Sequence, residues 1–187
     1  MERLGTFADA RIKVLADVMR LLSTVQRVAA TPIAEVEAGI AVLKQLRAET
    51  YEDLNQIQHE FMIVGAAEWL VTQNRVPPET VWSWNPRQTG LADEPDLRGE
   101  HDGAIILSAE ITTSTEPKGL IDSRMRTTLQ KLSAMGGERF YFTASTAMCQ
   151  RARTKIRKAG WQIEAVHLPA AKVEMAGIGA QRSAGTP

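Results

Sequence analysis

Two carboxylates occur where a predicted β-hairpin would bring them together. Asp96 follows Pro95 at the start of one predicted strand, and Glu110 lies fourteen residues later, near the end of the next. Asp102-Gly103 between them is a strong signal for a two-residue turn, which would place the two strands side by side. Acidic side chains on neighbouring strands offer the oxygen ligands that Mg²⁺ prefers, and such a metal can activate water and stabilise charge on a phosphate. The spacing therefore predicts a divalent-metal site.

Pro95-Asp96, a spacer and Glu110-Ile111-Thr112 together resemble the motif of the PD-(D/E)xK nucleases, the superfamily of many restriction endonucleases and repair nucleases. The resemblance implies that Asp96 and Glu110 bind Mg²⁺ or Mn²⁺. It also implies that the main-chain carbonyl of Ile111 is a further ligand of that metal.

The sequence departs from this motif at its lysine. In the superfamily the lysine is thought to position the attacking water or to stabilise the developing charge, and here Thr112 stands at its position. Two lysines could replace it, because Lys118 follows the strand by six residues and Lys131 lies on the next predicted helix. If neither does, the fold is retained but the site is inactive.

Members of the superfamily often use a further glutamate on the helix before the first strand. Glu68 is in helical register with apolar residues such as Ile57 and Val64, so we expect its carboxylate to point toward the core. A carboxylate there is costly unless it is paired or bound to a metal. Glu60, at the edge of the same stripe, is the second candidate. The resemblance thus makes both residues candidate metal ligands and Glu68 a candidate catalytic residue.

The net charge of the chain is zero, but two of its segments carry opposite net charges. Residues 118–158 contain ten basic residues against two acidic ones, whereas residues 93–116 contain seven acidic residues against one basic. A basic flank beside an acidic metal pocket suits phosphodiester cleavage, because basic groups hold the nucleic-acid backbone while carboxylates hold the metal. The alternative is a solvated helix face without a partner. The predicted nucleic-acid contacts are Arg124, Arg151, Arg153, Lys155, Arg157 and Lys158.

The hydrophobic pattern predicts an α/β protein in three parts. Residues 1–49 form a helical segment whose apolar stripe, from Phe7 to Val28, is wide enough to pack on the core or on a second subunit. Residues 50–168, by the resemblance, form a restriction-endonuclease-like αβββαβ core with a mixed central sheet. Residues 169–187 are small and polar and are predicted to be a flexible tail. The pattern leaves open whether one helix runs through residue 49 or breaks there.

Composition excludes several other classes of protein. Apolar residues make up 44% of the chain and charged residues 24%, which excludes a protein that is disordered throughout. The single cysteine, Cys149, excludes a disulfide framework and a cysteine zinc site. The sequence has no long apolar run and no signal-peptide pattern after Met1, so we expect a cytoplasmic protein without a membrane partner.

These observations predict a Mg²⁺-dependent deoxyribonuclease that uses a metal-activated water. The resemblance extends to restriction-type enzymes, which commonly act as dimers because a duplex has two strands to cut, and it thereby implies a homodimer. The alternative is a catalytically inactive nuclease-fold subunit that binds nucleic acid or a protein partner in a larger complex. A third hypothesis is a helical oligomerisation module joined to an unrelated sheet domain.

Overall fold

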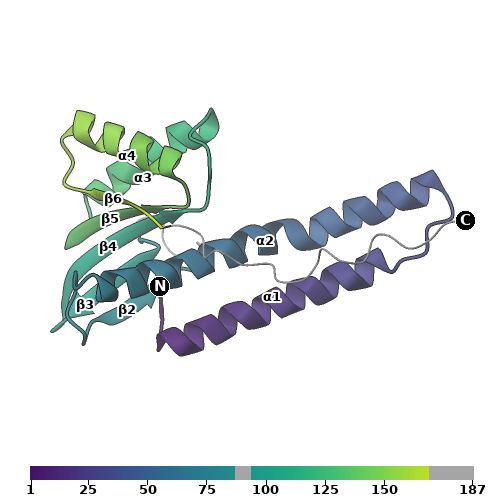
Figure 1. Cartoon of the computed structure of the whole chain (residues 1–187), viewed down its shortest axis with the longest axis horizontal. Coiled ribbons are helices and arrows are strands. Elements are labelled where there is room, and N and C mark those ends of the chain that lie inside the picture. Colours follow the sequence, from purple (N-terminus) through teal and green to yellow (C-terminus); the bar gives the residue numbers. More distant parts are fainter. Residues whose placement is uncertain (87–93, 169–187) are drawn as a thin grey trace, which may run out of the picture.

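A computed structural model describes residues 1–86 and 94–168 (Figure 1). The predicted tail, residues 169–187, lies outside the described residues. Within those residues, no helix is both long enough and apolar enough to cross a membrane. The elements are β1 (Glu2–Arg3), α1 (Phe7–Ala29), α2 (Val36–Thr72), β2 (Val81–Trp84), β3 (Leu97–His101), β4 (Ala104–Thr112), α3 (Leu120–Ser133), β5 (Glu138–Thr143), α4 (Thr146–Ala159) and β6 (Glu164–His167).

The six strands form one mixed sheet in the order β1-β2-β3-β4-β5-β6, so the protein is α/β as predicted. Neighbouring strands from β1 to β4 are antiparallel, whereas β4, β5 and β6 are parallel to one another. Parallel neighbours need a crossover connection, and α3 and α4 supply it between β4 and β5 and between β5 and β6. These two helices cover one face of the sheet, and the C-terminal part of α2 covers the other (Figure 1).

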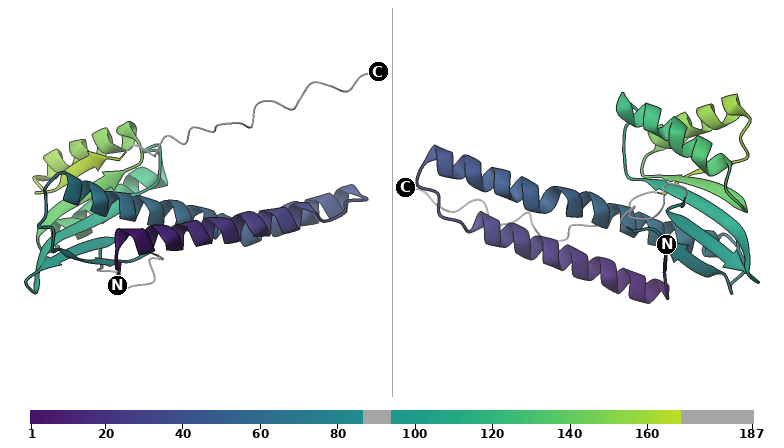
Figure 2. Two further views of the ribbon diagram at one scale, coloured as in Figure 1. Left: turned by 60° about the horizontal axis from the view of Figure 1, so that its bottom comes forward. Right: turned by 180° about the vertical axis from the view of Figure 1, so that it is seen from behind.

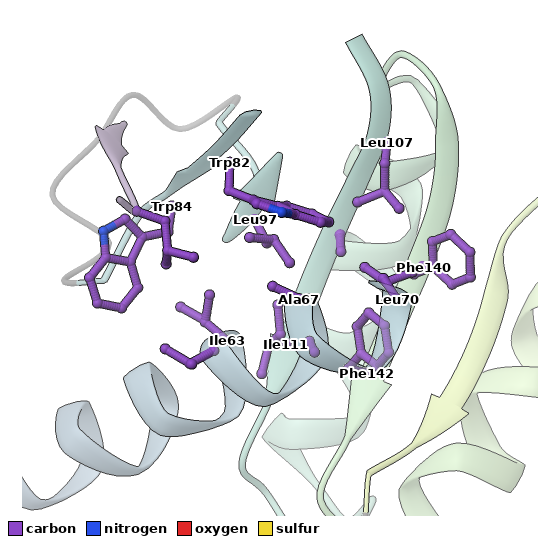
Figure 3. Close-up of a cluster of buried hydrophobic side chains, with 14 of the residues drawn as sticks. Ile63, Ala67, Leu70, Trp82, Trp84, Leu97, Leu107, Ile111, Phe140 and Phe142 are labelled. Atoms are coloured by element: carbon purple, nitrogen blue, oxygen red, sulfur yellow. The ribbon is translucent and has the colours of Figure 1, made fainter. Parts of the chain in front are cut away.

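The two faces of the sheet carry separate hydrophobic cores. On β5, Phe140 and Phe142 pack in the core under α2, whereas Tyr141 between them packs with α3 and α4. Successive side chains of a strand point to opposite faces, so β5 contributes side chains to both hydrophobic cores. Trp82 and Trp84 are buried on the α2 side (Figure 3).

The turn at Asp102-Gly103 joins β3 and β4, as the sequence predicts. Both residues have positive φ, 49° and 75°, the backbone that a type I′ hairpin turn requires. The strands pair antiparallel, with Leu97 opposite Ala109. Extending this register by one residue brings Asp96 opposite Glu110. The hairpin therefore positions the two predicted carboxylates next to each other.

α1 and α2 form an antiparallel hairpin that extends away from the sheet (Figures 1 and 2). α2 is continuous through residue 49, so the boundary predicted between residues 49 and 50 falls inside a helix that serves both parts. Val14 and Leu21 of α1 pack against Ile57 of α2. Only the C-terminal part of α2 contributes to the core of the sheet. We call residues 7–57, which comprise α1 and the projecting part of α2, the arm.

Ion pairs attach α1 to the part of α2 that covers the sheet. Lys13 Nζ lies 2.6 Å from Glu60 Oε2 and 3.2 Å from Asp17 Oδ2. The side chain of Glu60 is only 1% exposed, so this carboxylate has lost almost all of its hydration. The Lys13 ammonium also lies 5.3 Å from the ring centroid of Trp84, in cation–π geometry. One lysine thus neutralises a buried acid and contacts the sheet core.

Replacing Lys13 by methionine should lower the free energy of unfolding by roughly 3 kcal/mol, because it leaves the Glu60 carboxylate buried without a partner. Lys13→Met/Glu60→Gln should recover most of that loss. Arg11→Met removes the partner of the more exposed Glu68 and should cost less than about 1 kcal/mol. Urea unfolding at pH 7 measures all three variants. Equal losses for Lys13→Met and Arg11→Met would contradict the role given to Glu60 burial.

Candidate functional site

Asp96 and Glu110 line one cavity of about 270 Å³. It lies beside the carboxyl ends of the parallel strands β4 and β5, next to the first turns of α3 and α4, where α/β sheets commonly bind ligands. Ile111 and Thr112 of the sequence motif line the same cavity, as does Arg124 from α3. The structure therefore brings five of the predicted site residues together.

Asp96 is held in place from two directions. It is 4% exposed, and its Oδ2 accepts a 2.7 Å hydrogen bond from the main-chain N–H of Ile111. The Nε2 of His59, on α2, lies 3.3 Å from the same oxygen. Burial alone would lower the pKa of His59, but the nearby Asp96 carboxylate outweighs it and raises that pKa. The raised pKa therefore favours a protonated His59 that pairs with the Asp96 carboxylate.

His59 is a residue that the sequence analysis missed. The three histidines, at positions 59, 101 and 167, show no metal-like spacing, so the sequence marks none of them as part of a site. A usable signal was present, since His59 is in helical register with Ile63, Ala66 and Leu70, which are all fully buried. A histidine on the buried face of a helix needs a polar partner, and that requirement could have pointed to Asp96.

Glu110 is an acid in an unfavourable environment. It is 6% exposed, and its Oε1 has no hydrogen-bond partner of good geometry. Burial and, next, the charge of Asp96 raise the pKa of Glu110 to about 8, while Lys131 and His59 oppose the shift. Without a further cation, the Glu110 carboxyl is thus largely protonated near pH 7. Two carboxylates that share a small site behave in this way, because the second charge is repelled by the first.

The structure distinguishes the two lysines proposed to replace the one missing at Thr112. Lys131 Nζ, on α3, lies 2.5 Å from Glu110 Oε1 and also donates to the main-chain carbonyl of Glu94 at 3.2 Å. Lys118 is 80% exposed and pairs with Glu116 at 2.6 Å. Lys131 is therefore the lysine that accompanies the carboxylate pair.

The structure does not bring Glu60 and Glu68 into this cavity. Glu60 pairs with Lys13 instead, and Glu68 pairs with Arg11 at 2.5 Å. The expected inward orientation of Glu68 is wrong, because its side chain is 27% exposed and borders a separate cavity of about 600 Å³. The reason is that α1 packs alongside α2 and supplies a cation to each acid. Across residues 1–86 and 94–168, no three His, Cys, Asp or Glu side chains form a metal-binding group.

The basic residues of α4 have mixed environments. Arg151 and Lys155 contact Asp122 of α3 at 2.7 and 3.1 Å, and they hold the pKa of Asp122 far below its usual value. Arg153 donates two hydrogen bonds to the main-chain carbonyl of Ala165. A basic cavity of about 360 Å³ is lined by Arg126, Arg151, Thr154, Lys155, Lys158 and Trp161.

Searches against protein-family models, curated proteins and solved structures found no match to this chain.

Glu110→Gln should stabilise the protein in a pH-dependent manner. The pKa of Glu110 is raised above that of an unfolded glutamate, so its stabilising contribution is fully present below about pH 4 and is lost as the pH rises through about 8. Glutamine stays neutral, so the variant should gain roughly 1–3 kcal/mol over the wild type at pH 9 and about half as much at pH 6.

Urea unfolding at the two pH values measures this effect. Glu116→Gln is the matched control, because Glu116 is exposed and should change stability by less than about 0.5 kcal/mol at either pH. A gain for Glu110→Gln that is the same at pH 6 and pH 9 would show that the buried carboxyl does not titrate in this range.

Proposed function

We propose that this protein is a metal-dependent nuclease of the PD-(D/E)xK type that hydrolyses phosphodiester bonds in DNA. One observation carries the proposal, namely that Asp96 and Glu110 converge on a single cavity while Lys131 lies 2.5 Å from Glu110. Fold alone does not establish function, so the argument rests on the chemistry of these side chains.

The arrangement of elements is consistent with the proposal. From α2 to β5 the order is helix, three strands, helix, strand, which the resemblance implies for the core of this superfamily. The first three of these strands are antiparallel neighbours, and β5 pairs parallel to β4. This topology places the end of β4, with Glu110 and Thr112, beside the first turns of α3 and α4.

The donor set fits Mg²⁺ or Mn²⁺. Two carboxylates and the main-chain carbonyl of Ile111 would hold the ion, and hard divalent cations prefer oxygen ligands of these kinds. Glu110 Oε1 is a buried acceptor without a well-formed hydrogen bond, which a cation would satisfy. When bound, the metal would supply a Lewis acid that activates water and offsets charge on the phosphate.

The chain's own residues have distinct roles in this proposal. The Ile111 N–H fixes the orientation of Asp96, and His59 lies 3.3 Å from the same carboxylate oxygen, which limits reorganisation when a ligand binds. The Lys131 ammonium replaces the lysine missing at Thr112 and stabilises negative charge next to Glu110. Arg124, in the wall of the cavity, binds a phosphate oxygen, and the basic face of α4 holds the nucleic-acid backbone.

The second candidate function is an inactive nuclease-fold subunit that binds nucleic acid or a protein partner. The observation in its favour is that the cations near the site already have acidic partners. Lys131 pairs with Glu110, and Arg151 and Lys155 pair with Asp122. Thr112 cannot carry charge, so a site in which Lys131 stays with Glu110 lacks a free catalytic cation.

Cleavage of plasmid and single-stranded DNA with Mg²⁺ or Mn²⁺ tests the nuclease proposal. Glu110→Ala should abolish cutting, because it removes half of the carboxylate pair. Lys131→Met should slow cutting by about 100-fold, the usual scale for the loss of one charge-stabilising group. Lys118→Met, at an exposed lysine outside the cavity, is the control and should cut at the wild-type rate. Wild-type protein that cuts no DNA substrate with either metal would favour the inactive subunit.

Mn²⁺ binding measured by calorimetry provides a test that is independent of turnover. The metal must displace the proton from Glu110, whose pKa is raised to about 8. Affinity should therefore rise by up to about tenfold per pH unit between pH 6 and 8 and level off above that. Asp96→Asn should lose this binding. If the wild type binds no Mn²⁺ at pH 8.5, the carboxylate pair is not a metal site.

A further inference from the structure

The side chains of the projecting part of α2 are all at least partly accessible to solvent. None of residues 36–56 is buried, although α1 runs beside them. A helix of this length that buries no side chain is only marginally stable in water, since tertiary packing supplies most helical stability. The arm nevertheless extends well away from the sheet (Figure 2). Its apolar side chains are therefore left uncovered by residues 1–86 and 94–168.

α1 carries two apolar stripes and uses one of them. Val14 and Leu21 pack against α2. Ile12, Leu15, Met19 and Leu22 recur at steps of three, four and three residues and are each 50–65% exposed. At 3.6 residues per turn, Leu15 and Met19 lie roughly 100–160° around the helix from Val14 and Leu21. The second stripe thus faces away from α2 and has the spacing of a coiled-coil seam.

α2 has an unpaired stripe of the same kind. Val36, Ile40 and Leu43 follow at steps of four and three residues, and Leu54 continues the heptad pattern one and a half repeats later. These four side chains are 48–77% exposed. Both helices of the arm therefore present heptad-spaced apolar residues to solvent, α1 along its middle and α2 mainly at Val36, Ile40 and Leu43, nearer the tip of the hairpin.

We infer that a second copy of this chain covers these stripes, so that two arms pack into a four-helix bundle and the protein is a dimer. A helical hairpin with one unpaired apolar stripe on each helix is half of such a bundle. The ten large apolar side chains of the arm that are at least 48% exposed would bury on the order of 500 Å² of apolar surface per chain. That matches the apolar share of the roughly 800 Å² that each partner contributes to a standard stable interface.

The charge of the arm indicates self-association. Residues 7–57 contain six basic and seven acidic side chains, so two identical arms meet without net repulsion. Residues 118–158 differ, since their ten basic residues against two acidic ones would repel a second copy. The inference does not rest on nuclease activity, because no residue of the arm lines the cavity at Glu110.

The test is the mass of the full-length protein in solution, measured by sedimentation equilibrium over a range of micromolar concentrations. The wild type should be a dimer. Leu15→Glu/Met19→Glu and, separately, Ile40→Glu/Leu43→Glu should each raise the dimer dissociation constant by at least about 100-fold, because each pair places two carboxylates in an apolar seam. Circular dichroism checks that the variants remain helical, as expected for substitutions at exposed positions.

Leu120→Glu is the matched control. Leu120 is a 65% exposed helical leucine on α3, outside the arm, and its replacement should leave the dimer intact. A wild type that is monomeric throughout the concentration range would overturn the inference and assign the stripes to a different partner. A dimer that survives both arm variants would also overturn it, because another surface would then hold the two chains together.

Discussion

The main-chain N–H of Ile111 donates a 2.7 Å hydrogen bond to the Asp96 carboxylate at the point where β3 meets the end of β4. This contact depends on the register of the hairpin, because a slip of one residue would send Glu110 to the opposite face of the sheet. The type I′ turn at Asp102-Gly103 pairs His101 with Ala104, and a β-bulge between Gly99 and Glu100 then shifts the register by one residue, so that Leu97 lies opposite Ala109. The facing of Asp96 and Glu110, and with it part of the rise in the pKa of Glu110, follows from the pairing of these two strands.

The two layers around the sheet contribute differently to the candidate site. α2, which covers one face of the sheet, contributes His59, and this residue contacts Asp96. α3, on the other face, contributes Arg124 to the cavity wall and Lys131, which pairs with Glu110. The negative charge of the carboxylate pair is thus compensated from both faces, yet the compensation is incomplete, since the pKa of Glu110 remains raised. A buried carboxylate pair whose charge is incompletely compensated lowers the stability of the fold, and such destabilised groups are common at functional sites.

α1 explains why Glu60 and Glu68, the two further candidate ligands, do not reach the cavity. Its basic residues Lys13 and Arg11 lie along the face that meets α2 and take up Glu60 and Glu68. These acids join the arm to the sheet core and do not serve the cavity. The same helix leaves Leu15 and Met19 exposed on its outer side. α1 therefore attaches inward through ion pairs and a narrow apolar seam, and it presents a second apolar stripe outward.

The sequence by itself determined the features that depend on local chemistry. The Asp102-Gly103 turn and the strand alternation that buries Trp82 and Trp84 are set within a few residues. The hairpin brings Asp96 and Glu110 close together, although their exact facing also requires the β-bulge between Gly99 and Glu100. The sequence also determined the α/β class and the order of elements in the sheet domain, because the spacing of apolar residues differs between helices and strands.

Only the tertiary structure decided the contacts that span long stretches of chain. The choice of Lys131 over Lys118, the approach of His59 to Asp96 and the pairing of Glu60 with Lys13 each require two elements to dock in a particular orientation. Helical periodicity predicts which face of a helix is buried, but it does not specify what that face meets. The absence of proline and glycine around residue 49 permits a continuous α2, and the docking of its C-terminal part on the sheet decided that continuity.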